Sequence, residues 1–127
     1  MMAKPKIKVI IADDEPLMRS NLAEALRSRG IDVPAQVGAV NAVYETVLKH
    51  RPCILLLDLK WYGDSQKAIN AIRDIRSTFH DVKIIAMTAW PKLREAAAQA
   101  GAIDAVEKGF SVEQIVNLIK DHSSEHV

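Results

Sequence analysis

The sequence has one cysteine, few aromatic residues, no long apolar segment and no excess of charge of either sign. Cys53 has no partner for an intramolecular disulfide, which favours a packed hydrophobic role in a reducing cytosol. The first apolar run, 9–12, is too short for a signal peptide or a membrane span. A net charge of +1 without a basic cluster argues against a nucleic-acid surface. We therefore expect a cytoplasmic domain that itself binds neither membranes nor nucleic acids.

The 127 residues are 49% hydrophobic, which suits one globular domain spanning 1–127. Its central feature is the apolar run Ile54-Leu55-Leu56-Leu57, which ends at Asp58. An unbroken apolar run this short is typical of a strand buried on both faces, in the middle of a parallel sheet. The last residue of such a strand lies at the carboxyl edge of the sheet, where open α/β folds bind ligands. Asp58 is thus a candidate functional residue.

Strand-like and helix-like segments alternate along the chain. Strands are expected at 6–12, 33–37 (an edge strand, because of Pro34), 54–57, 82–87 and 104–107. Five helices are expected. The first begins at Pro16 and has an apolar stripe of Leu17, Leu22, Ala25 and Leu26; the second contains Val40, Val43 and Val47; the third contains Ile69, Ile72, Ile75 and Phe79. The fourth spans 92–100, and the fifth begins at the Ser111/Gln114 capping box. A polar tail is expected from 121 to 127, beyond a core of 6–120. Five strand–helix repeats predict an α/β, doubly wound fold, with helices on both faces of a five-stranded parallel sheet.

In that fold, polar residues from four strands share one edge of the sheet. Asp13 and Asp14 follow the first strand, Asp58 ends the third, Thr88 ends the fourth and Lys108 follows the fifth. Adjacent carboxylates repel one another and raise one another's pKa unless a cation neutralises them. Oxygen ligands suit a hard ion such as Mg²⁺. The pattern therefore predicts a magnesium site at this edge.

The same residues have the chemistry that phosphoryl transfer needs. A carboxylate on a rigid strand end, such as Asp58, can attack phosphorus as a nucleophile. Lys108 and the hydroxyl of Thr88 would hold the oxygens of the transferred group. Positioning and charge neutralisation are most of what this reaction requires of a protein.

Four segments, "VIIADDEP", "ILLLDLK", "MTAW" and "GAIDAVEKGF", resemble the receiver domains of two-component response regulators in both content and order. The resemblance covers 6–120 and implies the flavodoxin-like sheet of order 2-1-3-4-5 with five helices. It implies that Asp58 is the phosphoacceptor. Magnesium would be held by Asp13, Asp14, Asp58 and the backbone carbonyl of Lys60, and the phosphoryl group would be sensed by Thr88 and Lys108.

The resemblance also implies partners. Receiver domains accept their phosphoryl group from a histidine kinase or a histidine phosphotransfer domain, and then change the face formed by the fourth helix, fifth strand and fifth helix. They promote their own phosphorylation and dephosphorylation, but they are not turnover enzymes. Output is expected through a domain beyond residue 127 or through a homodimer.

Departures from the family's pattern concern the switch. Ala105 stands where the family usually has tyrosine or phenylalanine, and Gly109 stands where it usually has proline. One hypothesis is that Trp90 occupies the space left by Ala105 and reports on the site; the alternative is that Trp90 packs on the fourth helix. Trp61 and Tyr62 are open to two interpretations, loop packing or a partner-facing patch.

Three other functions compete with that of a phosphorylatable receiver. The departures make a receiver-like interaction module that no longer switches by phosphorylation a credible alternative. A haloacid-dehalogenase-like phosphohydrolase needs Asp-x-Asp at its nucleophile, but Lys60 stands two residues after Asp58. Dinucleotide binding is disfavoured because the turn after the first strand is not glycine-rich.

Overall fold

The computed structural model describes residues 6–61 and 63–123, in which strands and helices alternate. The strands are β1 (Lys8–Ala12), β2 (Asp32–Val37), β3 (Cys53–Asp58), β4 (Val82–Thr88) and β5 (Asp104–Glu107). The helices are α1 (Pro16–Arg27), the 3-10 turn η1 (Val40–Ala42), α2 (Val43–His50), α3 (Gln66–Thr78), α4 (Leu93–Ala100) and α5 (Val112–Ser123). Within these described ranges, no helix is long and apolar enough to cross a bilayer.

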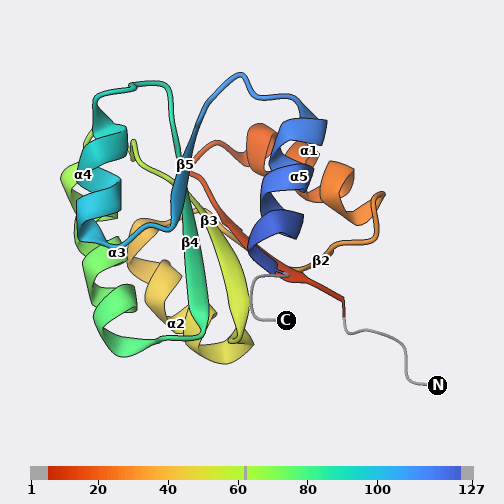
Figure 1. The fold of residues 1–127 in the computed structure, drawn as a ribbon, viewed down its shortest axis with the longest axis horizontal. Coiled ribbons are helices and arrows are strands. Elements are labelled where there is room, and N and C mark those ends of the chain that lie inside the picture. The colour runs from red at the N-terminus through yellow and green to blue at the C-terminus, as the bar shows by residue number, and fades with distance from the viewer. Residues whose placement is uncertain (1–5, 62, 124–127) are drawn as a thin grey trace.

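The strands form one parallel sheet in the order β2-β1-β3-β4-β5. Helices α1 and α5 cover one face, and α2, α3 and α4 cover the other (Figure 1). This is the doubly wound, flavodoxin-like arrangement predicted from the sequence. Because all strands run in the same direction, their carboxyl ends lie along one edge of the sheet.

Strand β3 holds the two hydrophobic cores together. All six of its residues are buried. Leu55 and Leu57 pack in the core beneath α2, α3 and α4, whereas Ile54 and Leu56 pack in the core beneath α1 and α5. The unbroken apolar run is therefore explained by helices on both faces. It also places Asp58 at the end of a strand that is buried on both faces.

Cys53, at the start of β3, is 7% exposed and has no disulfide partner. Burial raises the pKa of its thiol to about 11, although the charge of Lys8 opposes the shift. An unreactive, packed side chain is thus the interpretation that the structure supports.

Strand β2 lies at the edge of the sheet, as Pro34 predicts. Its pairing with β1 is irregular: Lys8 is opposite Asp32, but Ile10 is opposite Ala35, so β2 carries one extra residue there. A proline without an N–H group is tolerated at such a bulge because no ladder hydrogen bond has to be made.

Two details of the predicted helices were wrong. Leu17 is 73% exposed, whereas the predicted Leu26 is buried, the predicted Leu22 packs against the core, and Ala23, which was not predicted, is also buried. Val40 lies in the 3-10 turn η1 rather than in α2, which begins at Val43. Helical periodicity indicates which residues share a face of a helix. It does not indicate how far along the helix that face is covered by the sheet and the neighbouring helices.

The expected polar tail also begins later than predicted, because α5 continues to Ser123. His122 lies 3.1 Å from the carboxylate of Asp104 on β5, and its main-chain carbonyl accepts a hydrogen bond from Lys83. These contacts fasten the last turn of α5 to the sheet. The remainder of the predicted tail, 124–127, lies outside the described residues.

Replacing Gly101 with alanine should lower the free energy of unfolding by about 3 kcal/mol, from backbone strain and overpacking. Gly101 ends α4 with φ of 123°, a conformation that favours glycine. An added Cβ would lie 2.5 Å from Cγ and 2.9 Å from Cβ of Arg76. Since the Cβ of Arg76 is fixed to α3, α3 and α4 would have to separate. Urea unfolding measures the loss.

Gly30→Ala is the matched control. Gly30 also has positive φ, of 81°, but no atom lies within 4 Å of the site of its Cβ. We expect a loss of only about 1 kcal/mol from the backbone conformation alone. Equal losses for the two variants would contradict the proposed clash with Arg76.

Candidate functional site

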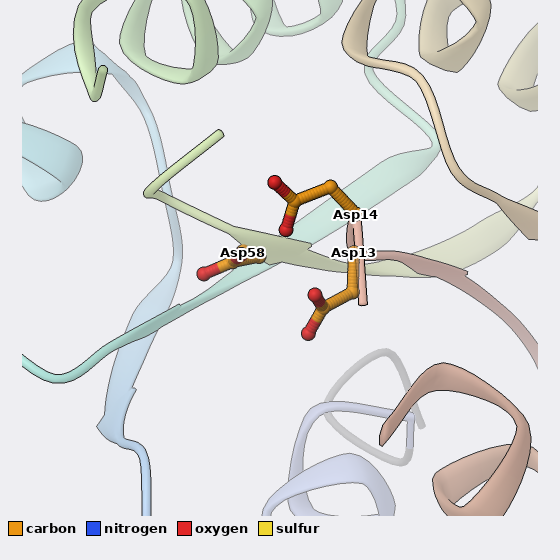
Figure 2. Close-up of side chains that lie close together, drawn as sticks. All are labelled: Asp13, Asp14 and Asp58. Atoms are coloured by element: carbon orange, nitrogen blue, oxygen red, sulfur yellow. The ribbon is translucent and has the colours of Figure 1, made fainter. Parts of the chain in front are cut away.

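The predicted acidic residues meet at the carboxyl edge of the sheet. Asp13 and Asp14 follow β1, Asp58 ends β3, and one carboxylate oxygen from each lies within 4.8 Å of the other two (Figure 2). Asp13 is 1% exposed and Asp58 is 2% exposed, while Asp14 is half-buried. Buried carboxylates this close to one another need a cation.

Lys108 supplies one positive charge. Its Nζ lies 3.2 Å from Oδ1 of Asp58 and 3.4 Å from Oδ2 of Asp13. Its main-chain N–H donates to the carbonyl oxygen of Thr88 at 2.8 Å, which continues the pairing of β4 and β5 past the end of β5. The lysine side chain is therefore held over the two buried acids by the sheet itself.

The electrostatics of the site appear in two pKa shifts. Burial raises the pKa of Asp58 to about 6, helped by the charge of Asp13 and opposed by Lys108 and the main-chain N–H of Lys60. For Lys108, burial lowers the pKa, but the charges of Asp58 and Asp13 outweigh burial, so that the net shift is upward. Lys108 stays protonated, and Asp58 resists ionisation.

Local hydrogen bonds fix the loop after β1. Oδ1 of Asp13 accepts from the main-chain N–H of Glu15 at 3.0 Å. The carbonyl oxygen of Asp13 accepts from Nη1 of Arg19 at 2.7 Å. A Cβ on Gly38 would lie 2.9 Å from that Nη1, so glycine leaves room for the guanidinium. Arg19 was not predicted, because nothing in the sequence pattern distinguishes this half-buried arginine from a solvent-facing residue of a helix.

Thr88 is at the edge but is turned towards its own loop. The residue is 1% exposed. Its hydroxyl accepts a hydrogen bond from the main-chain N–H of Trp90 at 2.9 Å and lies 3.3 Å from the carbonyl oxygen of Trp90. Thr88 is thus buried beside the strand ends, with its hydroxyl engaged by the β4–α4 loop.

Trp90 lies partly at the surface, which contradicts the hypothesis that its side chain fills the space left by Ala105. Its side chain is 45% exposed, and its ring lies 4.7 Å from Nζ of Lys60, a cation–π contact between the loops after β3 and β4. On β5, the main-chain carbonyl oxygen of Ala105 accepts a hydrogen bond from Arg94 of α4 at 2.9 Å. Whether Trp90 reports on the site stays a prediction.

In the loop after β3, the structure decides between loop packing and a partner-facing patch for Trp61. Trp61 is 2% exposed and packs in the core, which excludes a partner-facing role for its ring. Its indole N–H donates to the carbonyl oxygen of Asp58 at 2.6 Å. The spacing of three residues from Asp58 was the only sequence signal for this bond. Tyr62 lies outside the described residues.

The donor set fits a hard divalent ion. Three carboxylates offer oxygen atoms, and Lys108 balances only part of their charge. Magnesium prefers oxygen ligands and needs only one or two carboxylates with water and phosphate oxygens. The main-chain N–H of Lys60 donates to Oδ1 of Asp58 at 3.3 Å, and a role for the Lys60 carbonyl as a ligand stays a prediction.

Comparisons with known proteins place this geometry in a family. The model of the response regulator receiver domain matches residues 9–120. The chain is 31% identical over 115 residues to the transcriptional regulatory protein PdtaR of Mycobacterium tuberculosis, covering 89% of the chain and 55% of that protein. It is 27% identical over 120 residues to the sensory transduction protein LytT of Bacillus anthracis, covering 94% of the chain and 48% of that protein. The chain thus spans about half the length of these relatives.

Solved structures agree with the family. The signal receiver domain assigned to the response regulator NarL of Mycobacterium tuberculosis superimposes with a TM-score of 0.86 at 25% identity, covering 96% of this chain and 99% of that one. The isolated receiver domain of RcsB from Salmonella enterica serovar Typhimurium has a TM-score of 0.80 at 22% identity, covering 95% and 91%, and shows the shared fold. Sequence, fold and the strand-end acids agree: the chain belongs to the receiver domain family of two-component response regulators.

Proposed function

We propose that Asp58 accepts a phosphoryl group from a histidine kinase or a histidine phosphotransfer domain. Magnesium would be held by Asp13, Asp14, Asp58 and the main-chain carbonyl of Lys60. The observation that carries this proposal is the placement of a buried carboxylate 3.2 Å from a lysine and within 4.8 Å of two further acids. A carboxylate held only for stability would not be buried among like charges.

In the proposed reaction, an Asp58 carboxylate oxygen attacks the phosphorus atom of phosphohistidine. The new P–O bond makes an acyl phosphate, the P–N bond breaks, and the leaving imidazole keeps the electron pair and takes up a proton. Bound magnesium would neutralise charge on the phosphoryl oxygens. Lys108, already between Asp58 and Asp13, is placed to pair with one of those oxygens.

The proposed output begins at Thr88. Its hydroxyl would exchange the main chain of Trp90 for a phosphoryl oxygen, which moves the loop that leads into α4. Arg94 of α4 contacts β5 at the carbonyl oxygen of Ala105 and lies 3.6 Å from the carboxylate of Glu107. A displaced α4 would therefore change the face formed by α4, β5 and α5.

Several further expectations join this proposal. The chain acts as one receiver domain over 1–127 that promotes its own phosphorylation and dephosphorylation without being a turnover enzyme. Its signal passes to a domain attached after α5 or to a second copy of the chain. A cytoplasmic location, where the unpaired Cys53 stays reduced, belongs to the same proposal.

The second candidate is an interaction module that does not depend on phosphorylation. Ala105 favours it, because the small side chain on β5 cannot swing between two positions as an aromatic ring does. In that case the face formed by α4, β5 and α5 would bind its partner in one fixed state.

Incubating the protein with acetyl phosphate and excess Mg²⁺ should add one phosphoryl group, seen by intact mass. With EDTA the adduct should be absent, since the three acids would have no divalent ion to offset the incoming charge. Borohydride reduction, which converts an aspartyl phosphate to homoserine, should place the change at Asp58 in a peptide map.

Asp74→Asn, which neutralises an exposed acid on α3, is the matched control and should be phosphorylated normally. If neither acetyl phosphate nor a phosphorylated histidine kinase domain gives an adduct in the presence of Mg²⁺, the interaction module becomes the better account.

A further inference from the structure

The side chain of Trp61 is hydrogen-bonded to the main chain of the candidate phosphoacceptor, Asp58. Its indole N–H donates to the carbonyl oxygen of Asp58 at 2.6 Å, and the bond is buried. Donor and acceptor residues are three positions apart, so the bond closes a tight turn over Leu59 and Lys60. The side chain thus does what a main-chain hydrogen bond does in a β-turn.

The rest of the turn is fixed at both ends. At the strand end, the N–H of Leu59 donates to the carbonyl oxygen of Met87 on β4 at 3.0 Å. At the other end, the main chain of Trp61 pairs with that of Asp64 through two hydrogen bonds of 2.9 Å. The carboxylate of Asp64 accepts from the N–H of Gln66 at 2.9 Å, where α3 begins. Lys60 is the part of the turn between these anchors.

Core packing and one hydrogen bond together hold the Trp61 ring, which is 2% exposed. Trp61 lines a cavity of about 710 Å³ between η1, α2 and α3, together with Val40, Tyr44 and Ala71. The hydrogen bond to Asp58 is the contact that ties its position to the site, and phenylalanine or leucine in the same place could not make it.

We propose that Trp61 is a positioning residue for the metal-binding end of the site. By holding the carbonyl of Asp58, its indole N–H sets the path of the Lys60 peptide, whose N–H reaches Oδ1 of Asp58 and whose carbonyl is one of the expected magnesium ligands. This inference rests on the proposed function, because it assumes that Mg²⁺ binds here. Partners behind a ligand commonly control metal affinity in this way.

Calorimetric titration of Trp61→Phe with Mg²⁺ tests the inference. Phenylalanine keeps an aromatic ring in the core but removes the N–H donor. We expect the Kd for Mg²⁺ to rise at least about fivefold, within the range seen when a group that orients a ligand is removed. Tyr44→Phe is the matched control, because it removes a polar group from the same cavity without contacting the site, and its Kd should stay within about twofold of the wild type.

Urea unfolding in EDTA separates positioning from stability. A lower midpoint for Trp61→Phe with an unchanged Kd for Mg²⁺ would show that the residue only packs, and would overturn the inference. If the wild type binds no Mg²⁺, the proposed function itself fails and the inference falls with it. If the wild type binds and Trp61→Phe binds equally well, only the inference fails.

The wild-type protein gives a second measurement that needs no variant at Trp61. In ¹⁵N-edited NMR the indole N–H of Trp61 should exchange with water at least about tenfold more slowly than that of the half-exposed Trp90. Its resonance should move on saturation with Mg²⁺. A Trp61 resonance unaffected by saturating Mg²⁺ would contradict the inference even if Trp61→Phe did not fold.

Discussion

Replacing Asp58 with asparagine should abolish the phosphoryl adduct and, at the same time, stabilise the Mg²⁺-free protein at pH 8 by about 3 kcal/mol. Asparagine has almost the same shape but is neither a nucleophile nor an anion. The wild-type carboxylate is 2% exposed, and burial together with the charge of Asp13 raises its pKa to about 6. The chemistry of Asp58 therefore comes at the expense of stability.

The direction with pH follows from the two states. In the unfolded chain the pKa of an aspartate is about 3.9, so the folded protein binds this proton more readily than the unfolded chain does. Protonation of Asp58 therefore adds stability as the pH falls from about 7 to about 4. The advantage of Asp58→Asn over the wild type should shrink to about 0.5 kcal/mol at pH 4, because Asp58 of the folded wild type is then protonated and as uncharged as asparagine.

Urea unfolding in EDTA at pH 8, 6 and 4 measures this difference. Comparing Asp58→Asn with the wild type at each pH cancels the titration of all other groups. Asp74→Asn, which neutralises an exposed acid on α3, should change stability by less than about 0.5 kcal/mol with no trend in pH. An Asp58→Asn protein no more stable than the wild type at pH 8 would show that ionised Asp58 is not destabilising.

The site residues were predictable because a parallel sheet orders them. An apolar run buried on both faces identifies β3, and the rule that strand ends share an edge then brings Asp58 to Asp13 and Asp14. Lys108 follows from the same rule, since it comes directly after β5. Here, sequence position alone specifies spatial position, because short connections leave few topologies.

Contacts that depend on side-chain direction were not predictable. Leu17 fits the helical stripe of α1 yet is exposed, and His122 reaches Asp104 across 18 positions of sequence. The orientation of Trp61 depends on one hydrogen bond to a main-chain carbonyl, which no periodicity encodes. Such contacts depend on where each side chain points and therefore require coordinates.

Removing the charge of Lys108 should have the opposite effect to removing that of Asp58. In Lys108→Met, two carboxylates that are almost fully buried lose the ammonium group 3.2 and 3.4 Å away. Breaking a buried ion pair from one side is costly, and we expect a loss of about 3 kcal/mol in EDTA at pH 8. The pKa of Asp58 should also rise further, because Lys108 lowers it in the wild type.

Magnesium should reverse much of this loss. Lys108 competes with any divalent ion for the same carboxylate oxygens, so its removal should tighten Mg²⁺ binding by about tenfold. A ligand that binds only the folded state stabilises it according to its concentration relative to Kd, so Mg²⁺ should raise the stability of Lys108→Met more than that of the wild type. Calorimetric titration and urea unfolding with and without Mg²⁺ measure both effects.

Lys67→Met, which removes the same charge from an exposed position on α3, separates this local effect from the change in net charge. It should leave stability and Mg²⁺ affinity nearly unchanged. In an Asp58→Asn background, Lys108→Met should cost about half as much, because only Asp13 would remain without its partner. An equal cost in both backgrounds would mean that Lys108 does not act on Asp58, and unchanged or weaker Mg²⁺ binding would mean that lysine and metal do not share these oxygens.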